Sequence, residues 1–168
     1  MKGPRQYIYL LIIGGGIILL DQTTKIWIDT HMRLYETQPI LSGFLDLHYI
    51  RNPGAAFGFL SNNQSDWRIP FFVGISVFAI GIILFLFHKL ESSEVLMPMA
   101  LSLVLGGALG NLIDRIRLGE VIDFILVHYK SFRWPAFNVA DMAISAGVFL
   151  LIIRMFFLEP DKKENPPG

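Results

Sequence analysis

Val121-Ile-Asp-Phe-Ile-Leu-Val-His-Tyr129 and Pro135-Ala-Phe-Asn-Val-Ala-Asp-Met142 stand on either side of a short polar bridge. Each stretch carries one aspartate among apolar neighbours, Asp123 in the first and Asp141 in the second. Asp141 opens an apolar run long enough to cross a membrane, and we expect Asp123 to lie in the loop just before it. Burial disfavours the charged form of a carboxylate, so two carboxylates brought together here would make the acid–base pair of an aspartyl hydrolase.

The composition is that of an integral membrane protein. Of the 168 residues, 53% are hydrophobic and only 17% are charged, whereas about 25% are charged in soluble domains. The net charge is zero, which gives no electrostatic reason to expect a nucleic-acid partner. The chain contains no cysteine, and this excludes disulfides, thiolate metal sites and a cysteine nucleophile.

Four apolar stretches predict a single membrane domain with four transmembrane helices, at about residues 7–28, 69–87, 95–113 and 137–158. At about 1.5 Å per residue, helices of these lengths cross a hydrocarbon core of roughly 30 Å. The first stretch also has the basic start and apolar core of a signal peptide. We favour a retained span, because a polar Asp21-Gln-Thr-Thr-Lys25 follows it in place of a cleavage site. Gly106-x-x-x-Gly110, and Ala143 with Gly147, predict close helix packing.

The longer polar segments differ in pattern. In residues 29–67, Leu45, Leu47 and Tyr49 alternate with polar residues, which is typical of a half-buried strand, and Asn52-Pro-Gly54 predicts a turn. We expect this β-rich segment to be extracytoplasmic and to lie on the membrane surface, with Trp67 as an interfacial anchor. Residues 114–136 are expected to form an outer loop, and residues 159–168 a disordered tail.

Four spans place both termini on one side of the membrane. Lysine and arginine are denser in the termini and in the short turn near Lys89 than in the two longer segments. Under the positive-inside rule this density favours cytoplasmic termini, and the aspartates then face outward.

Polar residues that share a depth at the outer ends of the spans are the candidates for chemistry. Asp21 and Lys25 are four residues apart, which fits either a mutual ion pair or a role beside a site. We expect Asp114 to be ionised and structural, because Arg115 stands next to it. The full set is Asp21, Lys25, Asn52, Asn111, Asp114, Arg115, Asp123, Asn138 and Asp141.

Asp123 and Asp141 stand apart from this set because no lysine or arginine lies within five positions of either. If they meet, like-charge repulsion raises one of the two pKa values, and the pair shares one proton near neutral pH. One carboxylate could then accept a proton from water while the other donates to a carbonyl oxygen. The alternative is that Asp141 only caps its helix. The four histidines show no metal-ligand spacing, and we expect no metal or cofactor.

The chain resembles the bacterial lipoprotein signal peptidases (signal peptidase II) over essentially its whole length. Any one of the matching blocks is a weak signal, but five in this order on a four-span chain are highly specific. The blocks are Asp21-Gln-Thr-Thr-Lys25, Asn52-Pro-Gly-Ala-Ala-Phe57, Gly106-Gly-Ala-Leu-Gly-Asn-Leu-Ile-Asp-Arg115, Gly119-Glu-Val-Ile-Asp-Phe124 and Phe137-Asn-Val-Ala-Asp141.

The resemblance implies an aspartic endopeptidase of the bacterial inner membrane. Such an enzyme removes the signal peptide from diacylglyceryl-modified prolipoproteins, just before the lipidated cysteine. The resemblance places the catalytic dyad on Asp123 and Asp141 and implies that membrane lipid is a partner; we expect a monomer. It also implies substrate-binding or supporting roles for Asn52, Gly54, Asn111, Arg115, Asn138, Asp21 and Lys25, and we add Asp114.

Two other classes of function remain open on the residues alone. A proton-coupled transporter would carry intramembrane carboxylates, but near the middle of the membrane and beside broken helices. A scaffold protein would tolerate replacement of the aspartates by asparagine.

Overall fold

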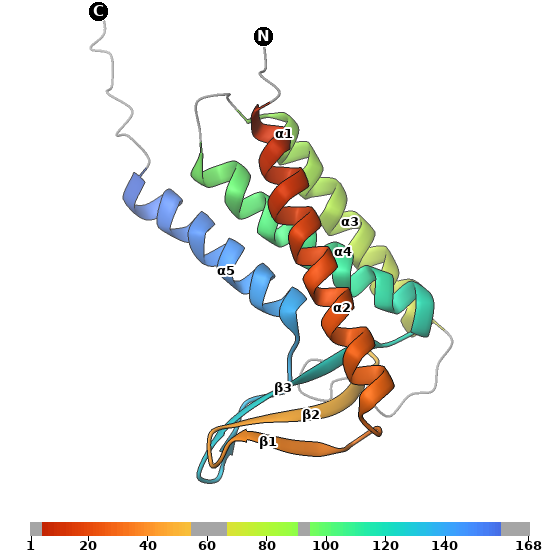
Figure 1. Ribbon diagram of the computed structural model, residues 1–168. Coiled ribbons are helices and arrows are strands. Elements are labelled where there is room, and N and C mark those ends of the chain that lie inside the picture. Colours follow the sequence, from red (N-terminus) through yellow and green to blue (C-terminus); the bar gives the residue numbers. More distant parts are fainter. Residues whose placement is uncertain (1–4, 55–66, 91–94, 159–168) are drawn as a thin grey trace, which may run out of the picture.

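The structure is a computed structural model, and it describes residues 5–54, 67–90 and 95–158. Four of its helices are long and apolar enough to cross a membrane, and a small antiparallel sheet lies at one end of them (Figure 1). The predicted fold class is therefore confirmed. The tail expected at residues 159–168 lies outside the described residues.

The helices have the following bounds. The first span, Gln6–His31, is a continuous helix made of α1 (Arg5–Tyr9), a π-helical turn η1 (Leu10–Gly14) and α2 (Gly15–His31). The other spans are α3 (Arg68–His88), α4 (Leu96–Leu118) and α5 (Val139–Ile153), the last continued by a π-helical turn η3 (Arg154–Leu158).

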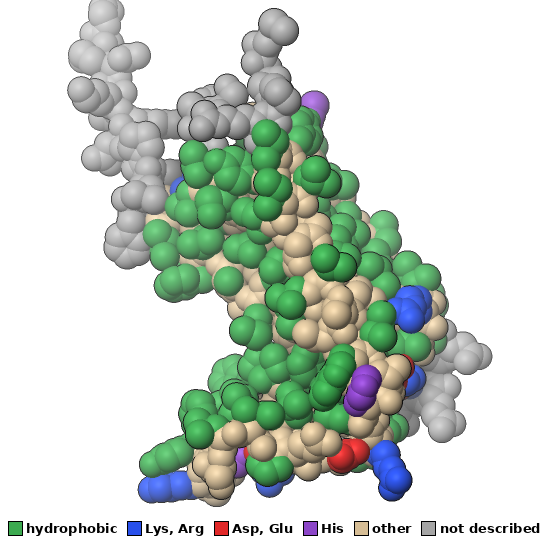
Figure 2. Space-filling view, in the orientation of Figure 1, with side chains coloured by type: hydrophobic (Ala, Val, Ile, Leu, Met, Phe, Trp, Pro, Cys, Tyr) green, Lys and Arg blue, Asp and Glu red, His purple; other side chains and the backbone are tan. Residues whose placement is uncertain are grey.

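Helix α4 is the centre of the bundle and contacts each of the other spans. Of the 18 consecutive residues that make up the most apolar part of α4, 56% are buried. The corresponding figure for α3 is 6%, so α3 packs at the periphery of the bundle. Glycines allow this contact. A Cβ at Gly107 would lie 2.4 Å from the Ala140 carbonyl oxygen, so the first turn of α5 rests directly on α4. Apolar side chains cover the outside of the helices, and most charged side chains in this view lie near the sheet (Figure 2).

The sheet has four strands in the order β1 (Thr37–Leu41), β2 (Leu45–Asn52), β3 (Val121–Tyr129) and β4 (Phe132–Arg133). The alternating pattern at residues 45–49 does belong to a strand, β2. The expectation of an outer loop at residues 114–136, with Asp123 in it, was wrong. Residues 121–124 are all buried, so this strand shows a run of β-branched and aromatic residues in place of alternation.

Helix α4 also runs further than predicted. The expected end near residue 113 was wrong, because the helix continues to Leu118 and ends where Gly119 takes a left-handed conformation (φ 76°). Asn111, Asp114 and Arg115 therefore lie within its last turns, with the helix continuing beyond them.

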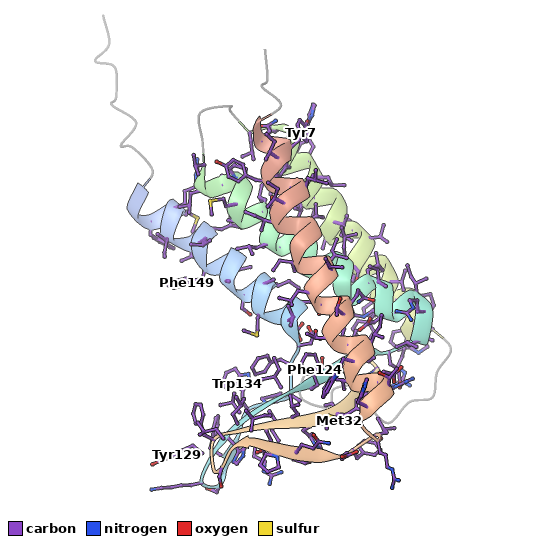
Figure 3. The ribbon with its side chains drawn as sticks, viewed as in Figure 1. Tyr7, Met32, Phe124, Tyr129, Trp134 and Phe149 are labelled. Carbon is purple, nitrogen blue, oxygen red and sulfur yellow. The ribbon has the colours of Figure 1, made fainter. Side chains whose placement is uncertain are left out.

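A hydrophobic cluster fixes the sheet to the end of the first span. Its buried members are Ile28 and Met32 from that end, Tyr49 from β2, and Ile122 and Phe124 from β3. Met32 and Phe124 lie between α2 and the sheet in Figure 3. Because Ile122 and Phe124 flank Asp123, the cluster fixes the height of Asp123 relative to the helices.

Candidate active site

The two aspartates come from different elements that one backbone contact brings together. Asp123 is the third residue of β3 and is 1% exposed, and Asp141 lies in the first turn of α5 and is partly exposed. Between them, the Phe124 and Ile125 N–H groups both donate to the Phe137 carbonyl, at 3.0 and 2.8 Å. The start of α5 is thus held against β3 immediately after Asp123.

Asn138 links the two carboxylates directly. Its fully buried amide nitrogen donates to Oδ1 of Asp123 at 2.7 Å, and its Oδ1 accepts the Asp141 N–H at 3.0 Å. Its own N–H donates to Oδ2 of Asp141 at 3.2 Å, which completes a capping box at the start of α5. Asp141 is therefore a helix-capping residue, as the alternative expected, and is also part of the polar network around Asp123.

Asn111 reaches Asp141 from α4. Its Nδ2 donates to Oδ1 of Asp141 at 2.8 Å, while its Oδ1 accepts from the Lys25 ammonium at 2.9 Å. A lysine can only donate, so it forces the amide oxygen toward itself and the amide nitrogen toward the carboxylate. Asp141 thus accepts a hydrogen bond on each of its oxygens, from Asn111 and from the Asn138 N–H.

Asn52, at the end of β2, binds Asp123 from the opposite side. Its Nδ2 donates to Oδ2 of Asp123 at 2.9 Å, and its Oδ1 accepts the Gly54 N–H at 3.0 Å. Gly54 has φ 104°, and a Cβ there would lie 2.3 Å from the Phe72 ring. Only glycine fits this turn, which orients the Asn52 amide.

Lys25, Asp21 and Asp114 form a buried ion cluster, which we call the Lys25 cluster. The ammonium lies 2.9 Å from Asp21 Oδ2 and 2.9 Å from Asp114 Oδ2. With Asn111, these contacts use all three of its donors. Asp21 and Lys25 are thus both a mutual ion pair and neighbours of the site. Asp114 is thus paired, as expected for a structural carboxylate, and the cation that contacts it is Lys25 of α2 rather than the neighbouring Arg115.

The Lys25 cluster also holds the backbone on which the two other aspartates stand. Asp21 Oδ1 accepts the Ala140 N–H at 2.9 Å, one residue before Asp141. Asp114 Oδ2 accepts the Ile122 N–H at 3.2 Å, one residue before Asp123. The cluster therefore fixes both elements of the site to α2 and α4.

Arg115 lies at the edge of this network. Its guanidinium is 5.8 Å from the centre of the Phe72 ring, and its Nη1 lies 3.4 Å from the Asn111 carbonyl oxygen. It interacts electrostatically with Asp141 and Asp123. Its positive charge thus lies beside the two carboxylates.

Burial raises the pKa of Asp123 to about 7. The negative charge of Asp141 adds to the rise, whereas the hydrogen bonds from Asn52 and Asn138 lower the pKa by stabilising the charged form. A carboxyl group with this pKa is protonated in about half of the molecules near neutral pH. Asp123 can thus keep or release a proton near neutral pH.

Two supporting residues escaped the sequence reasoning. The Gln22 side chain donates to Asp114 Oδ1 at 3.0 Å, to the Gly110 carbonyl at 3.1 Å and to Asp21 Oδ2 at 3.2 Å. A Cβ at Gly110 would lie 2.5 Å from Asp21 Oδ2, so this glycine makes room for the carboxylate. The position of Gln22 inside the Asp21–Lys25 block was the available signal, and Gly110 was interpreted only as a helix-packing residue.

Among the described residues no group of histidine, cysteine and carboxylate side chains could hold a metal ion.

Comparison with known proteins identifies the family. The family model for signal peptidase (SPase) II matches residues 8–157. The chain belongs to the signal peptidase II family. A lipoprotein signal peptidase of Syntrophus aciditrophicus is 48% identical over 162 residues, which cover 96% of this chain and 99% of that one. A lipoprotein signal peptidase of Geobacter sulfurreducens is 49% identical over 163 residues, covering 97% and 99%.

Solved structures share the fold of this chain. A bacterial membrane enzyme determined by the in meso method at 2.3 Å has a TM-score of 0.81 and 34% identity, covering 95% of this chain and 94% of that one. Another, at 1.9 Å, has a TM-score of 0.78 and 34% identity, covering 88% and 92%. Membership in the signal peptidase II family implies a protease, and with the four apolar spans it indicates a bacterial inner membrane protein.

Proposed function

We propose that the chain is an aspartic endopeptidase in which Asp123 and Asp141 activate water. The observation that carries the proposal is the pair of carboxylates, from β3 and α5, that both accept hydrogen bonds from Asn138 at the junction of the helices and the sheet. Each carboxylate also has its own amide donor, Asn52 for Asp123 and Asn111 for Asp141. This junction lies at the end of the bundle and not at its middle, which argues against a proton-coupled transporter.

The resting proton belongs on Asp123, whose pKa of about 7 exceeds that of an ordinary aspartate. Asp141, which accepts hydrogen bonds on both oxygens, takes a proton from water as the water oxygen bonds to the scissile carbonyl carbon. The carbonyl double bond opens, and its oxygen takes the Asp123 proton. Asp141 then protonates the leaving nitrogen as the C–N bond breaks, and one hydroxyl returns its proton to Asp123.

The substrate we propose is a prolipoprotein that already carries diacylglycerol, cut just before the lipidated cysteine. The support is the family and the depth of the site. A carboxylate pair at the junction of apolar helices and a sheet meets a peptide bond at the membrane surface, while the acyl chains stay in the bilayer. The chain has no cysteine, so the lipidated cysteine comes from the substrate alone.

We propose that the site lies at the outer face of the membrane and that both termini lie on the cytoplasmic side. The first turn of α1 and the last turn of η3 lie at the end of the bundle remote from the sheet (Figure 1). The denser lysine and arginine residues of the terminal segments favour the cytoplasm for that end.

A gel-shift assay with purified protein and a diacylglyceryl-modified prolipoprotein tests the proposal. We expect Asp123→Asn and Asp141→Asn each to lower the cleavage rate by about 10³-fold or more, since each removes one proton-transfer group. Asp46→Asn, which changes an aspartate of the same sheet outside the dyad, should cleave at the native rate. Chelators should have no effect. Native-like cleavage by either dyad variant, or inhibition by a chelator, would refute the mechanism.

A further inference from the structure

A second polar cluster lies outside the dyad, at the other face of β2. Asp29, in the last turn of α2, accepts a hydrogen bond from the Tyr49 hydroxyl and pairs with Arg51, whose Nη2 lies 2.8 Å from Oδ1. The Arg51 Nε donates to the Tyr49 hydroxyl oxygen at 2.9 Å. The three side chains thus close a triangle in which each contacts the other two.

This triangle is built into the core at one corner. Tyr49 is 3% exposed and packs in the hydrophobic cluster with Ile122 and Phe124, the two residues that flank Asp123. Burial raises the pKa of the Tyr49 hydroxyl, and its hydrogen bond to Asp29 raises it further, so the hydroxyl keeps its proton and remains a donor.

The triangle lies beside an irregularity in the pairing of β2 with β3. The pairing of β2 with β3 is irregular between Leu47 and Ile50 and resumes only at the Ile50–Asp123 pair. The backbone of Tyr49 bonds away from β3, to Tyr35 and Glu36. His48 and Tyr49 therefore have no ladder partner on β3, although residues 50–52 pair with residues 121–123. The triangle lies at this gap in the ladder, directly before Asn52.

We propose that Asp29, Tyr49 and Arg51 are positioning residues for hydrolysis: they clamp β2 to the end of α2 and hold the Asn52 amide on Asp123. Arg51 directly precedes Asn52, so the clamp acts one residue from the donor. None of the three touches the dyad. The inference rests on the proposed role of Asp123 and adds the device that keeps its hydrogen-bond donor in place.

The clamp has a chemical consequence as well as a structural one. A donor on the Asp123 carboxylate favours its charged form, so a displaced Asn52 leaves the proton more tightly held. The other groups that face Asp123 are Asp141 from α5, Arg115 from α4, Lys25 from α2 and the Asn138 amide. None of these is altered when the clamp is cut.

The test is an infrared titration of the protonated Asp123 carboxyl, together with pH profiles of kcat/KM, for protein in lipid nanodiscs. The infrared band is assigned by its loss in Asp123→Asn. Tyr49→Phe removes one hydroxyl from the clamp, and Asp29→Asn cuts it from the α2 side at a more exposed position. We expect the titration midpoint and the alkaline limb to rise by about half a unit to one unit, and kcat to fall about 5- to 10-fold.

The matched control is Asp46→Asn. It removes the Asp46–His128 pair (2.9 Å), which joins the same two strands at the end remote from Asn52. Its midpoint should equal that of the native protein. Unchanged midpoints in Tyr49→Phe and Asp29→Asn, with Asp123→Asn inactive, would overturn the clamp and leave the dyad standing. An equal rise in Asp46→Asn would also overturn it, because any loosening of the sheet would then suffice. An active Asp123→Asn would overturn both proposals.

Discussion

The Lys25 cluster and the dyad each hold two buried or half-buried aspartates at the same end of the bundle, but only one of them holds a cation. In the Lys25 cluster an ammonium lies 2.9 Å from both carboxylates, and backbone N–H groups satisfy them further. In the dyad the partners are neutral amides, and the pKa of Asp123 rises to about 7. The same side chain thus keeps a fixed ionic partner beside a cation, whereas beside amides its pKa is raised toward neutral pH.

Removing the Lys25 ammonium should destabilise the fold. Lys25→Met leaves Asp21 and Asp114 buried without a counter-charge, and loss of one partner of a buried pair costs about 3–5 kcal/mol of unfolding free energy. Reversible unfolding in mixed micelles measures this loss. Adding Asp114→Asn to Lys25→Met removes one of the uncompensated charges and should restore part of the stability. An unchanged stability of Lys25→Met would mean that the cluster is not a compensated charge group.

In the dyad, by contrast, ionisation of Asp123 should lower the free energy of unfolding. The pKa of Asp123 is about 7 in the folded protein and about 4 in the unfolded chain. Stability is therefore fully present below about pH 4 and is lost as pH rises through 7. Between pH 5 and pH 8, the native protein should lose on the order of 2 kcal/mol of unfolding free energy relative to Asp123→Asn.

The same unfolding titrations check this second prediction. Asp46→Asn serves as the control and should keep the pH slope of the native protein. If the native protein and Asp123→Asn lose stability in parallel over this range, the dyad does not hold a proton with a raised pKa.

Sequence reasoning found the elements that have a periodic or apolar signal and missed those that depend on neighbours. The four spans and strand β2 follow from hydropathy and alternation. Strand β3 was missed because residues 121–124 are covered on both faces, which removes the alternation by which a half-buried strand is detected.

The sequence indicated which polar residues lie together at the candidate site, but not which of them contact one another. Polar residues at one depth of apolar spans mark a site, whatever their partners. The choice of Lys25 over Arg115 as the partner of Asp114 depends on how α2 packs on α4, which sequence distance does not reveal. The same limit hid Gln22, whose three acceptors lie on α2 and α4, and the clamp between Asp29 and β2.

Gly110→Ala should displace the Lys25 cluster without changing its charge. A Cβ at Gly110 would lie 2.5 Å from Asp21 Oδ2, so Gly110→Ala must displace the carboxylate or the helix, at a cost of about 1–3 kcal/mol. Gly81→Ala on α3 is the control, because a Cβ there meets nothing within 4 Å, and it should leave stability unchanged or slightly higher.

The kcat of Gly110→Ala tells whether the Lys25 cluster positions the dyad or only stabilises the fold. Asp21 holds the Ala140 N–H, one residue before Asp141, so a displaced Asp21 carries the start of α5 with it. We expect Gly110→Ala to lower kcat as well as stability, and Gly81→Ala to change neither, in unfolding and gel-shift measurements on the same preparations. If Gly110→Ala lost stability but kept the native kcat, the Lys25 cluster would support the fold without positioning the dyad.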